Sequence, residues 1–183
     1  ASPWGLGAFI VIDGVPVEYF AIEVTRDDSS NPGIEHSQDS KVQQAYEALA
    51  LLVALRHWRY HWARTRCVIH VSGDNMAALS MVCRMQPHSA SLGVVARELA
   101  LDIADAIYQP QLASHIPGVA NVAADVLSRR YDPTKPPYVV PSILANSKEI
   151  HPAPRDAGWW RSLGTNDSMP TRHRQRGNKG RHA

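Results

Sequence analysis

Three acidic residues stand at positions in the sequence where carboxylates could do chemistry: Glu47, Asp74 and Asp125. Glu47 lies in an Ala- and Leu-rich helical stretch with no basic residue four positions before or after it, so it has no local ion-pair partner. Asp74 directly follows a short apolar run, and Asp125 lies among small and aliphatic residues after a Pro-Gly turn. Each acid alone could be structural: a tolerated helix residue, a helix N-cap, or a solvent-facing acid in a first helical turn.

Together, the three acids suggest a shared site, because they fall in three neighbouring predicted elements. Carboxylates that lie close together repel and raise one another's pKa values unless a cation lies between them. Oxygen ligands without His or Cys nearby select Mg²⁺ or Mn²⁺, and two such ions about 4 Å apart can bind the attacking and the leaving oxygen of a phosphodiester. This pattern predicts hydrolysis of nucleic acid, with Glu47, Asp74 and Asp125 as catalytic and metal-binding residues.

Two asparagines accompany these acids in the sequence. Asn75 follows Asp74, and Asn121 precedes the predicted helix that carries Asp125. Nucleic-acid hybrids are recognised by shape, mostly through phosphate and 2′-hydroxyl contacts, so we expect these two amides to be the polar groups best placed to touch the minor groove. Both could instead simply cap helices.

The elements that must position these residues follow from hydrophobic periodicity and turn signals. Asp13-Gly14 joins two β-branched and aromatic runs, which predicts that the chain opens with a β-hairpin. The Gly5–Gly7 pair within the first run indicates backbone clearance near a ligand, or a bulge. The remaining predicted elements are a long buried helix at 41–62, a strand within 66–75, helices at 76–85 and 91–108, a strand at 111–116 and a helix after Asn121. This order predicts an α/β fold with helices on a mixed sheet.

Composition and charge bound the class of protein. The 183 residues are 44% hydrophobic and 20% charged, as expected for a globular chain with one good core. Cys67 and Cys83 form no CxxC motif, and the start of the sequence lacks the pattern of a signal peptide. We therefore expect a reducing compartment, cytoplasmic or nuclear, with no disulfide and no membrane span.

The sequence changes character after Tyr131. Residues 1–131 carry 10 Lys/Arg and 13 Asp/Glu, a balance of −3, whereas residues 132–183 carry 9 and 4, a balance of +5. Prolines recur in the second part, and residues 171–183 contain five Lys/Arg and no acid. We expect one domain over 1–131 and a largely disordered, Pro-rich basic tail over 132–183. Within that tail, the tryptophans of Gly158–Trp160 are expected to dock on the core.

Four stretches in this order carry a family resemblance: "ASPWGLGAF", "QQAYEALALLVAL", "VSGDNMAAL" and "HIPGVANVAADVLSRR". They resemble the ribonuclease H domain attached to retrotransposon reverse transcriptases, over about residues 1–131. The resemblance implies a ribonuclease H-like fold, a five-stranded mixed sheet flanked by helices. It also implies that two Mg²⁺ (or Mn²⁺) ions and four carboxylates cut the RNA strand of an RNA–DNA hybrid. Glu47, Asp74 and Asp125 match the second, third and fourth carboxylates, and the implied neighbours are an upstream reverse transcriptase domain and a downstream polyprotein segment.

The sequence departs from the family pattern at two positions. The first carboxylate of the family would lie just before Ala1, so the chain as it stands lacks a central metal ligand and is expected to be nearly inactive. A mobile histidine follows the last-loop glycine in some relatives, but Val119 follows Gly118 here. Two other classes stay open: a transposon-derived domain that binds nucleic acid without cutting it, and a purely structural domain within a larger polymerase.

Overall fold

The computed structural model describes residues 1–32, 34, 40–62, 68–87, 89–105, 109–115 and 121–163. The elements in these ranges are β1 (Gly5–Ile12), β2 (Val15–Glu23), α1 (Arg26–Ser30), α2 (Ser40–His57), a 3₁₀ turn η1 (Trp58–His61), β3 (Val68–Gly73), α3 (Met76–Arg84), α4 (Ala90–Ala104), β4 (Gln109–His115), α5 (Val122–Ser128), a second 3₁₀ turn η2 (Ser142–Leu144) and β5 (Lys148–Glu149). The predicted mixed α/β class is confirmed. The described strands lie in two sheets, ordered β1-β2-β5 and β3-β4.

The opening hairpin forms as the sequence predicts. β1 and β2 pair antiparallel from Gly5 with Glu23 to Ile12 with Val15. Asp13 and Gly14 make the turn with φ values of 52° and 79°, which is the left-handed region that an Asp-Gly hairpin turn requires. The later pairs, β2 with β5 and β3 with β4, are parallel.

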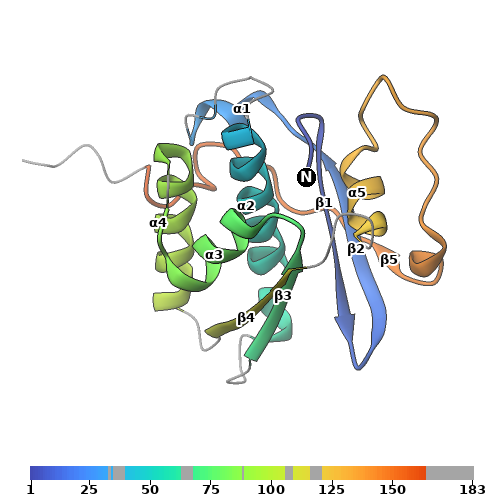
Figure 1. Ribbon diagram of the computed structural model, residues 1–183, viewed down its shortest axis with the longest axis horizontal. Helices are drawn as coiled ribbons and strands as arrows, with labels where there is room; N and C mark the ends of the chain where they lie inside the picture. The colour runs from blue at the N-terminus through green and yellow to red at the C-terminus, as the bar shows by residue number, and fades with distance from the viewer. Residues whose placement is uncertain are drawn as a thin grey trace, which may run out of the picture.

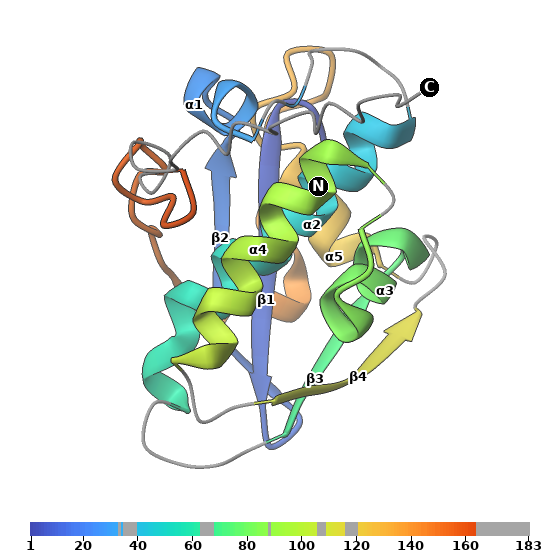
Figure 2. The same cartoon turned by 90° about the vertical axis from the view of Figure 1, so that its left-hand side faces the viewer.

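α2 lies at the centre of the molecule, between the β1–β2 hairpin and the helices α3 and α4 (Figure 1). α5 covers the opposite face of the hairpin, and α4 forms the outer layer over α2 (Figure 2). Because α2 is covered on several sides, apolar residues face in many directions from it. Its side chains that are at most 4% exposed are Ala45, Tyr46, Ala48, Leu49, Ala50, Leu52 and Val53.

Gly5 and Gly7 allow α5 to pack directly on β1. A Cβ atom at Gly5 would lie 2.5 Å from the Ser128 carbonyl oxygen, and one at Gly7 would lie 2.4 Å from the Leu127 Cβ. The backbone clearance predicted for this glycine pair is therefore filled by helix α5 rather than by a ligand. This contact fixes the helix that carries Asp125 against the strand that begins the chain.

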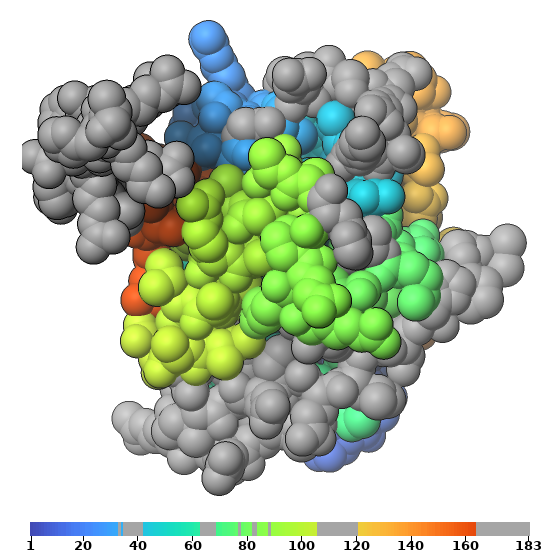
Figure 3. Space-filling model, turned by 60° about the vertical axis from the view of Figure 1, so that its left-hand side comes forward, coloured from blue at the N-terminus to red at the C-terminus, as the bar shows by residue number. Residues whose placement is uncertain are grey.

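The prediction that the chain beyond residue 131 is largely disordered is wrong for residues 132–163. Residues 142–163, here called the strap, contain η2 and β5 and run along β2 toward α4. Leu144, Ile150 and Trp160 of the strap are 0%, 7% and 2% exposed, so they complete the core, and the predicted docking of the tryptophans is confirmed. Figure 3 shows the orange-red end of the strap beside the yellow-green surface of α4. The basic residues 171–183 lie outside the described residues.

Candidate functional site

Two helices that carry candidate acids meet at the amino end of β1. The amino group of Ala1 lies 2.6 Å from Oε1 of Glu47 on α2. The hydroxyl of Ser2 donates to the carbonyl oxygen of Ser128 at the end of α5, over 2.6 Å. Glu47 therefore faces the amino end of β1.

Glu47 is held from its own helix as well. The side-chain amide of Gln43, one turn earlier on α2, donates to Glu47 Oε1 over 3.1 Å and to the carbonyl oxygen of Ala1. One amide thus connects the half-buried carboxylate to the start of the chain. Gln43 was visible in the sequence only as a helical neighbour of Glu47, and no local signal shows that it would also reach residue 1.

Asp125 is partnered by a basic residue on the same helix. Arg129 Nε donates to both carboxylate oxygens of Asp125, over 2.8 and 2.9 Å. The two side chains are 46% and 40% exposed, for Asp125 and Arg129 respectively, so solvent screens the pair and it contributes little to stability. The four-residue spacing between Asp125 and Arg129 is the sequence signal that identifies this pair.

Asp74 and the two asparagines occupy their predicted places in the fold. Asp74 is half-buried between the carboxyl end of β3 and the start of α3. Asn75, rather than Asp74, caps α3: its Oδ1 accepts the backbone N–H of Ala78 over 3.0 Å. Asn121 precedes α5 at the N-cap position, but its side chain makes no capping hydrogen bond.

The structure brings Glu47 and the start of the chain together, but it does not collect the three acids. Within the described part of the chain, no group of three or more His, Cys, Asp or Glu side chains is placed to hold a metal ion. The catalytic and metal-binding roles of Glu47, Asp74 and Asp125 therefore stay predictions. Residues 116–120, which include the Pro-Gly turn and Val119, lie outside the described residues.

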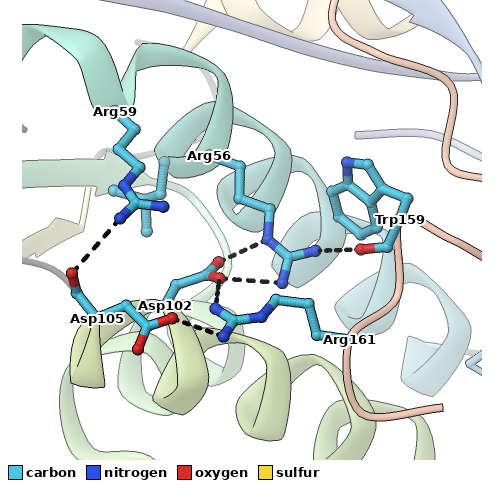
Figure 4. Close-up of a pocket in the computed structure, with 7 residues that line it drawn as sticks. Arg56, Arg59, Asp102, Asp105, Trp159 and Arg161 are labelled. Carbon is cyan, nitrogen blue, oxygen red and sulfur yellow. Dashed lines mark hydrogen bonds and ion pairs between the residues drawn. The ribbon is translucent and has the colours of Figure 1, made fainter. Parts of the chain in front are cut away.

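A second polar cluster, which the sequence analysis did not find, joins α2, α4 and the strap (Figure 4). Arg56 Nε donates to Asp102 over 2.6 Å, and its Nη2 donates to Glu98 over 2.5 Å. The same guanidinium lies 4.2 Å above the ring of Trp159. A cavity of about 330 Å³ opens beside it; its lining residues are Leu55, Arg56, Arg59, Asp102, Asp105, Trp159 and Arg161.

Glu98 is the most deeply enclosed acid of this cluster. Its side chain is 0% exposed, and its oxygens accept the backbone N–H groups of Arg161 and Ser162 over 3.0 and 2.6 Å. Burial acts to raise the pKa of Glu98, but hydrogen bonds from Ser162, Arg56 and Arg161 outweigh it and lower the pKa below 4.5. Glu98 is therefore a charged structural acid whose acceptor positions are filled by the strap and by α2.

No helix in the described ranges is long and apolar enough to cross a membrane. Comparisons with protein-family models, with curated proteins and with solved structures found no match.

Proposed function

We propose that this chain is a ribonuclease H-like domain of a retrotransposon reverse transcriptase polyprotein, which hydrolyses the RNA strand of RNA–DNA hybrids when the first acid precedes Ala1. The observation that carries the proposal is the convergence of two acid-bearing helices on the amino end of β1. Ala1 contacts Glu47 of α2, and Ser2 contacts α5, the helix of Asp125. The family resemblance places the first acid directly before Ala1. A residue joined to the nitrogen of Ala1 would lie next to Glu47.

The strand order is compatible with this proposal. If the sheets β5-β2-β1 and β3-β4 were joined through β1 and β3, they would make the single five-stranded mixed sheet that the resemblance implies. Glu47, Asp74 and Asp125 are the proposed catalytic residues, and Asn75 and Asn121 the proposed hybrid contacts. The need for Mg²⁺ or Mn²⁺ rests on the resemblance and on the acidic residue types. The proposed partners are an RNA–DNA hybrid, an upstream reverse transcriptase domain and a downstream polyprotein segment, in the cytoplasm or nucleus.

A second candidate function is nucleic-acid binding without cleavage. It is favoured by the cation that already contacts one of the acids, Arg129 at Asp125. Acids neutralised by the chain itself hold a cation less readily. A domain with this arrangement could bind a hybrid through its helix termini and basic residues and leave the RNA intact.

A cleavage assay separates the two functions. Three proteins are compared on a labelled RNA–DNA hybrid, with and without Mg²⁺: the chain as it stands, the chain extended by an Asp before Ala1 on a short leader, and the extended chain with Asp74→Asn. We expect Mg²⁺-dependent cutting by the extended chain alone, because the amide of the variant keeps the shape of Asp74 without its charge. Robust cutting by the unextended chain, or none by the extended one, would contradict the proposed site. Hybrid binding without cutting by all three would favour the second function.

A further inference from the structure

We propose that the surface formed by Asp28 on α1, Arg56 on α2, and Glu98 and Asp102 on α4 is a peptide-docking site. Its ligand class is an extended peptide with one arginine and, five residues later, a buried tryptophan followed directly by a second arginine. Residues 155–161 of the strap carry this pattern and occupy the site in the chain. The strap is thus a ligand held by its own contacts, and this inference does not depend on the proposed nuclease activity.

The first recognition point is a carboxylate that is positioned before the arginine binds. Asp28 Oδ2 accepts the backbone N–H and the hydroxyl of Thr25, over 2.8 and 3.0 Å, in the capping box that begins α1. Arg155 then donates from Nε and Nη2 to the two oxygens of Asp28, each over 2.6 Å. The side chains of Arg155 and Asp28 are 5% and 0% exposed, so the pair is buried. Its two parallel hydrogen bonds need the planar fork of a guanidinium, which lysine cannot supply.

The second recognition point is the tryptophan pair. Trp160 is 2% exposed, and its indole N–H donates to the carbonyl oxygen of Arg155 over 3.3 Å, so the peptide closes on itself as it docks. Trp159 lies against the guanidinium of Arg56, which also donates to the Trp159 carbonyl oxygen over 2.9 Å. Two aromatic side chains thus bury a large apolar area at the centre of the contact.

The third recognition point is the acidic face of α4. Glu98 binds the peptide backbone at residues 161 and 162, whereas Asp102 accepts the Arg161 side chain over 3.2 Å. Arg161 also donates to Asp105, one turn further along α4, over 2.6 Å. Backbone contacts set the direction of the peptide, and guanidinium contacts select its sequence.

The link between the core and the strap contributes little to this recognition. Residues 133–137 are exposed and form no helix or strand, and Thr134 turns back to bond Asp132 within the same loop. The contacts that hold the strap begin after this link. We therefore expect the strap to stay bound when the link is cut.

The test inserts a protease site between Lys135 and Pro136 of the full chain and cuts it after folding. We expect the two pieces to elute together in size-exclusion chromatography. We also expect a dye-labelled peptide of residues 150–163 to exchange into the complex, and fluorescence anisotropy measures this exchange. Hydrogen bonds to charged groups contribute about 1.5–3 kcal/mol, so Arg155→Lys in the peptide should weaken binding roughly 10- to 100-fold. The matched control is His151→Ala in the peptide, an exposed position where we expect at most about a twofold change.

Three results would overturn the docking site. Separation of the pieces on cutting would show that the link, rather than the contacts, holds the strap. A complex that never exchanges the labelled peptide would show that the strap is a permanent part of the fold. Equal binding of the Arg155→Lys and unchanged peptides would show that no guanidinium is recognised. Because the substitutions are made in the peptide, a change in its binding is not confused with misfolding of the protein.

Discussion

The amino end of β1 and the strap-docking surface both gather charged residues, but they enclose them to different degrees. At the amino end, Glu47 is 18% exposed and Asp125 is 46% exposed. At the docking surface, Asp28 and Glu98 are 0% exposed, and each receives at least three hydrogen bonds from fixed donors. A buried acid with its acceptor positions filled keeps the donors that already contact it, whereas an exposed acid with a screened partner, such as Asp125, can exchange that partner. The comparison separates the enclosed acids of the docking surface from the more exposed acids at the amino end of β1.

The largest expected effect comes from breaking a buried pair and comparing it with an exposed one. Arg155→Ala leaves the Asp28 carboxylate buried without its countercharge, so we expect the free energy of unfolding to fall by about 3–5 kcal/mol. Arg129→Ala removes an exposed pair four residues apart on a helix, which is worth about 0.3–0.5 kcal/mol. Urea denaturation followed by tryptophan fluorescence measures both changes. Similar losses in the two variants would contradict the distinction between the regions.

The next effect tests how closely α5 is fixed to the amino end of β1. Gly7→Ala would place a Cβ atom 2.4 Å from the Leu127 Cβ and 2.7 Å from the Ser128 backbone nitrogen. Because backbone cannot move aside at low cost, we expect the overpacking to destabilise the protein by about 1–3 kcal/mol.

Gly93→Ala on α4 is the matched control for this substitution. No atom lies within 4 Å of a Cβ at Gly93, so helix propensity should stabilise the protein by roughly 0.5–1 kcal/mol. Thermal unfolding of both variants gives the comparison. A Gly7→Ala protein as stable as the parent would mean that α5 is not seated on β1 as described.

The sequence predicted the parts of this structure that depend on local pattern. The Asp-Gly turn, the alternating strands and the buried helix around Glu47 follow from signals within a few residues of one another. The capping role of Asn75 also follows from its place directly before a helix. The ion pair of Asp125 with Arg129 follows from their four-residue spacing.

The strap was missed because its stability comes from contacts between distant segments. Prolines and net positive charge in residues 132–183 are typical of a disordered tail, and no local pattern shows that Arg155 pairs with a carboxylate 127 positions earlier. The same limit applies to Glu47, whose partner is the start of the chain. Spacing could place the acids on neighbouring elements, but it could not determine whether their carboxylates meet.

The smallest expected effect is a change with pH, and it sharpens the contrast between the enclosed acid Glu98 and an exposed one. The folded state lowers the pKa of Glu98 below 4.5, through hydrogen bonds that overcome the opposing effect of burial. The carboxylate is then stabilising above about pH 4.5, its ordinary value, and this stabilisation is lost as the pH falls through the lower pKa of the folded state. In Glu98→Gln, which cannot titrate, the urea midpoint should fall less steeply below pH 4.5 than in the parent.

Asp13→Asn in the exposed hairpin turn is the control and should keep the slope of the parent, since the amide tolerates the same left-handed backbone. A parallel loss of stability in Glu98→Gln and the parent over this range would contradict the role of the Glu98 charge in holding the strap. The backbone N–H groups of Arg161 and Ser162 would then bind the protonated acid as well as the carboxylate.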